Sequence, residues 1–177
     1  MTNYRRAWAP SATWFFTLNL ANRRSRLLAD QIDLLRASFQ DVQQAHPFKV
    51  IAMVVLPDHI HAIWELPPGD ADYAMRWRLI KTGFSRGIPK TEYRRPSLIN
   101  KHERGIWQRR YWEHLIRDEV DLDRHVDYIH INPVKHEHVS RTRDWPHSTF
   151  HRYVEKGLLP LDWGVAMDVE GDFGECR

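Results

Sequence analysis

The period of the hydrophobic residues changes along this 177-residue chain, and the order of those changes is the strongest constraint on its fold. From Thr13 to Leu20 (TWFFTLNL) large apolar side chains alternate with other residues, as in a half-buried strand. Between residues 28 and 45 apolar residues recur every three or four positions, as on an amphipathic helix. The same reasoning predicts strands at 13–20, 48–56, 59–66 and 107–117, and helices at 28–45, 73–84 and 120–131.

This order predicts an α+β fold of the ferredoxin-like, split βαβ type: β-α-β-β-α-β followed by one more helix. The central sheet is expected to be antiparallel, with two helices on one face and the last helix covering the other. Residues 86–105 show no period and are rich in glycine, proline and basic residues, so we expect a long loop there. Pro133 is expected to end or kink the last helix.

Length and composition favour one domain over residues 1–163, followed by an acidic, loosely held tail at 164–177. The single cysteine, Cys176, excludes an intramolecular disulfide and a metal cage built of cysteines. We see neither a signal peptide nor an apolar run of the ~20 residues that a spanning helix needs. The expected location is therefore the cytoplasm, with no membrane partner.

Two histidines of the third predicted strand, His59 and His61, project to the same side because side chains alternate along a strand. Paired imidazoles suit a metal ion. The pattern by itself is weak: surface histidines on a strand would give it too, and His136-Glu-His138 repeats it in a polar stretch.

A polar stripe follows on the last predicted helix. Asp121, His125, Tyr128 and Asn132 are spaced at i, i+4, i+7 and i+11, while Leu122, Val126 and Ile129 form its apolar side. A tyrosine and an amide one turn apart could therefore face the histidine pair. The alternative is a tyrosine at the rim of a packed helix, with the asparagine as a helix-end residue.

These segments resemble a known family. The run VVLPDHIH ending at His61, the run HVDYIHINPVKH from His125 to His136, the run DWPHSTF from Asp144 to Phe150 and the opening TWFFTLNL are similar to the REP-associated tyrosine transposases. These are the single-tyrosine branch of the HUH (His-hydrophobic-His) nucleases, related to the 200/605-type insertion-sequence transposases. The resemblance covers about residues 4–163.

The resemblance implies a site and a reaction. His59, His61 and Asn132 would hold a divalent metal ion, Mg²⁺ or Mn²⁺, and Tyr128 would be the nucleophile. Such enzymes cut single-stranded DNA at the foot of hairpins of repetitive extragenic palindromes, forming a 5′-phosphotyrosine and freeing a 3′-OH. No general base can be assigned; His125 and His130 could assist, although each is more often structural or solvent-facing.

The basic residues favour a DNA partner, although the formal net charge is only +3. We expect DNA contacts from Arg5, Arg6, Arg78, Lys81, Arg86, Arg94, Arg95, Lys101, Arg104, Arg109 and Arg110, with further phosphate contacts from Arg23, Arg24 and Arg26. The aromatic residues between them are candidates for stacking on unpaired bases, although most of the tryptophans are expected in the core: Trp77, Tyr93, Trp107, Tyr111 and Trp112. A merely solvated basic face is the alternative.

The predicted function is that of a single-strand DNA endonuclease and transposase acting on hairpins, as a monomer or a homodimer near the nucleoid of a bacterial-type cell. A DNA-binding regulator that keeps the fold but does not cut is the main alternative. A metal hydrolase of small molecules is a third, disfavoured by the basic and aromatic residues.

Overall fold

The computed structural model describes residues 9–90, 96–100 and 104–164. Its strands are β1 (Thr13–Asn19), β2 (Lys49–Val55), β3 (His59–Glu65) and β4 (Trp112–Leu115). Its helices are α1 (Leu27–Asp30), α2 (Ile32–Ala45), α3 (Tyr73–Gly87), α4 (Pro96–Ile99), α5 (Glu119–Lys135) and α6 (Phe150–Glu155), with a 3₁₀ turn η1 (Thr142–Asp144).

The four strands form one antiparallel sheet in the order β2-β3-β1-β4. Strand β3 lies between β2 and β1, and β1 lies between β3 and β4, as the split βαβ order requires. The predicted fold class is confirmed, and the two central strands are almost fully buried.

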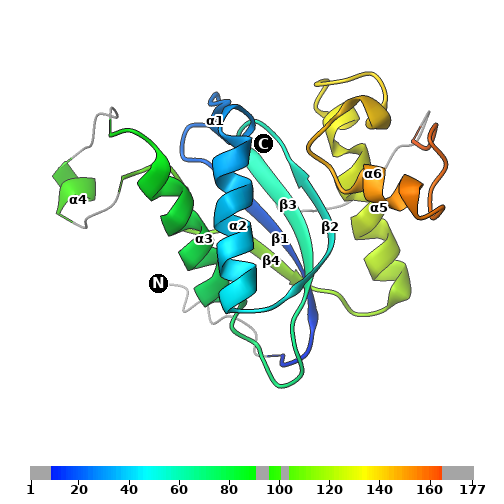
Figure 1. The fold of residues 1–177 in the computed structure, drawn as a ribbon, viewed down its shortest axis with the longest axis horizontal. Helices are drawn as coiled ribbons and strands as arrows, with labels where there is room; N and C mark the ends of the chain where they lie inside the picture. The colour runs from blue at the N-terminus through cyan, green and yellow to red at the C-terminus, as the bar shows by residue number, and fades with distance from the viewer. Residues whose placement is uncertain (1–8, 91–95, 101–103, 165–177) are drawn as a thin grey trace.

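Helices cover both faces of the sheet (Figure 1). On one face, α2 and α3 pack against the apolar side chains of β1 and β3; Trp77 of α3, for example, stacks on Trp64 of β3 with ring centroids 3.9 Å apart. On the other face, α5 packs Val126 and Ile129 against Phe15 and Ile63 of the sheet. The helix predicted to cover the second face is therefore α5.

Several boundaries differ from the prediction. The helix expected at 28–45 is interrupted at Gln31 and forms α1 and α2. The expected loop at 86–105 contains the short helix α4, and only Trp112–Leu115 of the strand-like segment 107–117 pairs as a strand, although Trp107 forms an isolated bridge with Leu20. Helix α6 was not expected.

Helix α5 does not end at Pro133, which was one of the two effects expected of this proline. It continues to Lys135, with Pro133 inside it. Proline removes only its own N–H bond, and the chain beyond it is held by bonds from His136 N to Asn132 O (3.0 Å) and from His138 N to Pro133 O (2.9 Å). Asn132 therefore stays helical, one turn beyond Tyr128 on the same side.

The chain after α5 returns to the sheet. Thr149 N donates to Met53 O of β2 (2.8 Å), and the Phe150 side chain is fully buried. Of the acidic tail predicted at 164–177, residues 165–177 lie outside the described residues. Within the part of the chain that the structure describes, no helix is long and apolar enough to cross a membrane.

Candidate active site

The register of the sheet places the two histidines of β3 opposite polar residues of β1. His59 pairs with Asn19, and His61 pairs with Thr17. Because directly opposed residues of an antiparallel pair project to the same face, all four side chains belong to the face that α5 covers. Both histidines are buried, and their rings lie 4.9 Å apart, centroid to centroid.

Thr17 orients the ring of His61. Its hydroxyl Oγ1 lies 2.9 Å from Nδ1 of His61, so a hydrogen bond fixes which nitrogen faces β1. The other ring nitrogen, Nε2, is buried on the opposite edge of the ring. The ring also stacks on Phe15, with centroids 5.6 Å apart. These contacts hold the imidazole in one orientation, as a metal ligand requires.

Asp58 orients the ring of His59 in the same way. His59 Nδ1 donates to Asp58 Oδ1 (2.8 Å), and the second carboxylate oxygen pairs with Arg23 (3.2 Å), which also donates to Asn19 Oδ1. Arg23, expected to contact DNA phosphate, is thus part of the support of this histidine.

The charges around His59 suit a neutral ligand. Burial lowers the pKa of His59, so the ring is neutral at physiological pH. Burial by itself would raise the pKa of the Asp58 carboxyl, but the hydrogen bond with His59 and the positive charge of Arg23 outweigh it and lower that pKa. Nε2 of His59 is buried and has no hydrogen-bond partner among the described residues. A buried lone pair of this kind fits a metal ion.

Tyr128 approaches this pair from α5. The ring of Tyr128 meets His61 edge to face at 5.1 Å between centroids. Asn132 follows one helical turn later on α5, and both residues are fully buried. The Nζ of Lys135 lies 4.7 Å from the centroid of the Tyr128 ring. The structure therefore brings His59, His61 and Tyr128 together and places Asn132 one turn beyond Tyr128.

The chain is similar to known transposases over most of its length. Residues 14–132 match the family model described as "Transposase IS200 like". A relative from Escherichia coli K12, described as a REP-associated tyrosine transposase, is 50% identical over 163 residues that cover 92% of this chain and 91% of the relative. The chain belongs to the REP-associated tyrosine transposases.

A second relative and a solved structure also match over almost the full length of this chain. A relative from Haemophilus influenzae is 45% identical over 179 residues, covering 97% of this chain and 99% of its own. A solved structure of a REP-associated tyrosine transposase bound to a REP hairpin is 47% identical, covers 100% of this chain and 98% of its own, and superposes with a TM-score of 0.85.

Sequence reasoning missed several residues around this transposase site. His136, at the end of α5, was seen only as part of a second His-x-His pattern, yet its ring lies 5.0 Å from that of His59. Asp58 was interpreted as a turn residue, and Thr17 only as part of the polar face of a strand. The register of β1 against β3 brings Thr17 to His61, and no local pattern reports that register.

The two histidines considered as general bases differ in position. His130 packs on the other side of α5, against Tyr153 (4.7 Å between centroids) and Thr149. Burial lowers its pKa to about 3. His125 instead lies on the sheet side, 4.7 Å from Phe15, which also contacts Tyr128.

Basic residues line both sides of a groove of about 1070 Å³ between α3 and residues 104–111. Its lining includes Arg78, Lys81, Arg86, Arg104, Trp107 and Arg109. Arg78, Arg86, Arg109 and Arg110 are exposed.

Other members of the predicted DNA-binding set have different places. Lys81 donates to Gln108 O (2.9 Å), and Arg104 donates to three carbonyl groups at the end of α3, so both hold the groove together. Trp77 is fully buried, so it belongs to the tryptophans of the core and not to the stacking candidates. Arg5, Arg6, Tyr93, Arg94, Arg95 and Lys101 lie outside the described residues.

Proposed function

We propose that this chain cuts single-stranded DNA beside hairpins of the REP type, with Tyr128 as the nucleophile. The observation that carries the proposal is the contact of Tyr128 on α5 with His61 of the histidine pair on β3, with Asn132 one turn further along α5. Membership of a transposase family and the REP hairpin bound by a relative of 47% identity support it.

In the proposed reaction, Tyr128 Oη forms a bond to the phosphorus, and the bond from phosphorus to the 3′ oxygen breaks. The products are a 5′-phosphotyrosine and a free 3′-OH, which takes up a proton. The phenol must lose its own proton, because an ordinary tyrosine is protonated at neutral pH. Because the energy of the broken bond is kept in the phosphotyrosine, rejoining needs no nucleotide.

Lys135 is the cation placed to assist this step. Its ammonium group lies 4.7 Å from the centre of the Tyr128 ring. A positive charge there favours the phenolate and attracts the DNA phosphate. Since the Tyr128 ring is fully buried, DNA binding has to displace the groups that cover it.

His59, His61 and Asn132 would hold the divalent ion. When bound, the ion would polarise the scissile phosphate and offset the charge of the transition state. The role of the protein is orientation: Thr17 and Asp58 hold the Nδ1 edges of the two rings, so that the Nε2 edges face the site. Nitrogen ligands are atypical for Mg²⁺, so we expect Mn²⁺ to bind more tightly in vitro.

The groove offers a path for the hairpin toward this site. Its wall at residues 106–108 is hydrogen-bonded to the end of β1, through Ala21 N to Ile106 O (2.9 Å) and Gln108 N to Asn19 O (2.9 Å). Asn19 is the cross-strand neighbour of His59. We infer that the exposed arginines bind hairpin phosphates while the unpaired flank runs toward Tyr128.

With DNA as its substrate, the protein is expected in the cytoplasm at the nucleoid, as a monomer or a homodimer. One domain through residue 163 is expected to suffice for binding and cutting.

The experiment is a covalent-adduct assay with a REP-type hairpin that carries a single-stranded flank, in Mn²⁺ or Mg²⁺. We expect a protein–DNA adduct from the wild type and from Tyr153→Phe. We expect none from Tyr128→Phe, and none from the wild type when a chelator is added. Tyr153 is a matched control, because its hydroxyl bonds only a backbone carbonyl of β2 among the described residues. Hairpin binding without any adduct from wild type would instead indicate a non-cleaving regulator.

A further inference from the structure

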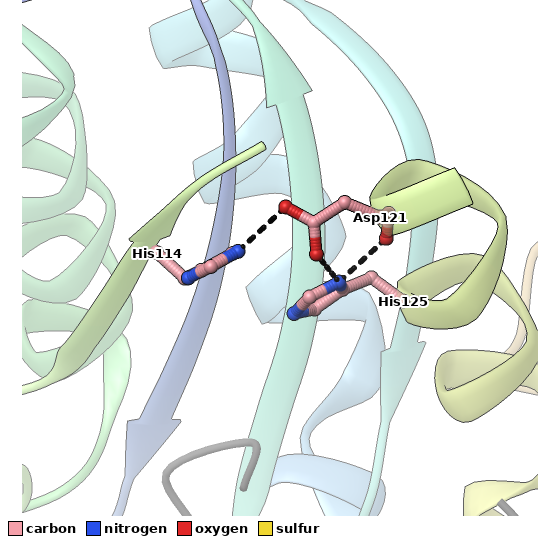
Figure 2. Close-up of side chains that lie close together, drawn as sticks. All are labelled: His114, Asp121 and His125. Atoms are coloured by element: carbon pink, nitrogen blue, oxygen red, sulfur yellow. Dashed lines mark hydrogen bonds and ion pairs between the residues drawn. The ribbon is translucent and has the colours of Figure 1, made fainter. Parts of the chain in front are cut away.

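A second cluster of metal-ligand side chains joins β4 to the first turns of α5. It consists of His114 on β4 and Asp121 and His125 on α5, as Figure 2 shows. His114 Nε2 lies 2.8 Å from Asp121 Oδ2, and His125 Nδ1 lies 3.2 Å from Asp121 Oδ1. One ligand atom of each residue lies within 4.8 Å of the others.

The cluster is partly buried, and its members are held in place. The two imidazoles stack at 4.7 Å between centroids with 15° between their planes. Asp121 Oδ2 also accepts from Arg117 N (3.0 Å), and His125 Nδ1 donates to the backbone oxygen of Asp121 (2.7 Å). Phe15 and Trp112 form the apolar wall behind the two rings.

The protonation states suit metal binding. Burial by itself would raise the pKa of Asp121, but the hydrogen bonds from His114 and Arg117 outweigh it and lower that pKa, so the carboxylate is ionised. Burial lowers the pKa of His125, so its ring is neutral at physiological pH. An anionic carboxylate oxygen beside a neutral imidazole is the state in which these two groups coordinate metals.

We propose that His114, Asp121 and His125 form a second metal site that takes a divalent first-row transition ion such as Zn²⁺. Two imidazole nitrogens and one carboxylate oxygen are a ligand set for such ions rather than for Ca²⁺ or Mg²⁺. Tetrahedral ligands about 2.0–2.1 Å from Zn²⁺ lie roughly 3.3 Å from one another. The 2.8 and 3.2 Å separations are close to that value, and metal binding would displace the proton that His125 Nδ1 donates to the backbone oxygen of Asp121.

This site is distinct from the one at His59 and His61. β4 and β3 flank β1 on opposite sides, so the strands that carry the two clusters are roughly 10 Å apart. Phe15 of β1 contacts both His125 and His61. A two-metal clamp needs ions about 3.5–4 Å apart. We therefore assign the second ion the role of a clip that fixes the start of α5, and with it Tyr128, on the edge strand β4.

The test is Zn²⁺ titration of the metal-free full chain by calorimetry, repeated with Co²⁺ for its visible absorption. To remove the first site, the background is His59→Ala with His61→Ala. In that background we expect one Zn²⁺ per chain, an affinity at least about 10-fold lower in Asp121→Asn, and no change in Asp123→Asn. Asp123 is an exposed carboxylate on the same helix, so its substitution controls for charge.

The outcomes separate a metal site from a hydrogen-bonded contact. Equal Zn²⁺ affinity in the Asp121→Asn and Asp123→Asn variants, or no Zn²⁺ bound in the background, would show that the cluster is a hydrogen-bonded contact only. If Asp121→Asn does not fold, His114→Gln replaces it, since that residue lies on the edge strand. A rise in the melting temperature with Zn²⁺, present with Asp123→Asn and lost with Asp121→Asn or His114→Gln, is the second expected readout.

Discussion

Asp58 Oδ1 accepts a 2.8 Å hydrogen bond from Nδ1 of His59, the neighbouring residue, and so directs the other nitrogen of that ring into the site. A carboxylate behind a ligating histidine fixes the tautomer and raises the basicity of the ring. In this chain the carboxylate is itself held by Arg23. Because this hydrogen bond orients His59, its loss is expected to lower the affinity of the site for a metal ion.

Replacing Asp58 with asparagine should weaken Mn²⁺ binding about 10- to 100-fold, because an amide neither fixes the tautomer nor supplies charge. The measurement is Mn²⁺ titration by electron paramagnetic resonance. Asp30→Asn, which changes an exposed carboxylate paired only with Arg26 in the described structure, is the control and should bind Mn²⁺ like the wild type. Equal affinity of the two variants would contradict a supporting role of Asp58.

Replacing Lys135 with methionine should slow adduct formation by about 10-fold while Mn²⁺ affinity stays unchanged. The variant removes the charge that lies 4.7 Å from the Tyr128 ring and keeps much of the side-chain volume. Single-turnover rates with a hairpin substrate measure the effect. Lys156→Met, an exposed lysine after α6, should react at the wild-type rate; an equal loss in both variants would mean that only general charge matters.

The buried His130 should make stability depend on pH. Its pKa is lowered to about 3 in the folded chain, against about 6.5 when unfolded, so the unfolded chain binds the proton first as the pH falls. The contribution of neutral His130 to the unfolding free energy is present above pH 6.5 and is lost as the pH falls toward 3. Between pH 7 and 4.5 it amounts to about 2–3 kcal/mol of unfolding free energy.

Urea unfolding at the two pH values, with a chelator present to remove metal ions, measures this loss of unfolding free energy. His130→Gln should reduce the difference by about 2 kcal/mol, because glutamine does not titrate. If the unfolding free energy of His130→Gln changes between the two pH values as much as that of the wild type, other groups cause the pH dependence.

Substitution of the exposed groove arginines should weaken hairpin binding through phosphate contacts. Each of Arg78→Ala, Arg86→Ala and Arg109→Ala should reduce the slope of log affinity against log salt by about 0.7–0.9. Fluorescence anisotropy of a labelled hairpin over a salt series measures it. Arg141→Ala, an exposed arginine near η1 and outside the groove, should leave the slope unchanged. A slope unchanged in all four variants would place the hairpin elsewhere.

Trp77 should act on stability and not as a base-stacking platform. It is fully buried and stacks on Trp64, so Trp77→Ala is expected to cost about 3–5 kcal/mol of unfolding free energy. Denaturant unfolding measures the loss. Trp107→Ala, on the half-buried groove wall, should cost less and should weaken hairpin binding more. A stable Trp77→Ala variant with weaker hairpin binding would contradict this assignment.

The order of the elements and the placement of His59 and His61 on one side of their strand could be predicted from the sequence, because periods of 2.0 and 3.6 residues are local properties. The sequence also placed Tyr128 and Asn132 one turn apart. What joins β3 to α5 is a tertiary contact, and the distance between His61 and Tyr128 has no local signal. The same holds for His114, which meets Asp121 only because β4 is packed beside the start of α5.

Two details could not be decided from residue type alone. Pro133 does not end α5, since proline removes only its own N–H bond and the helix continues to Lys135. Trp77 is a core residue and not a stacking platform, since its position on α3 faces β3. In both cases packing decided between alternatives that the residue type left open.

The central claim is that Tyr128 forms the covalent bond to DNA, and mass spectrometry of the trapped complex tests it most directly. After reaction with a hairpin substrate, the complex is digested with nuclease and protease, and the peptide that carries nucleotide is sequenced. We predict a nucleotide joined through its 5′ phosphate to Tyr128. A nucleotide on any other residue, or an unmodified Tyr128 peptide from a preparation that has cut its substrate, would contradict the account.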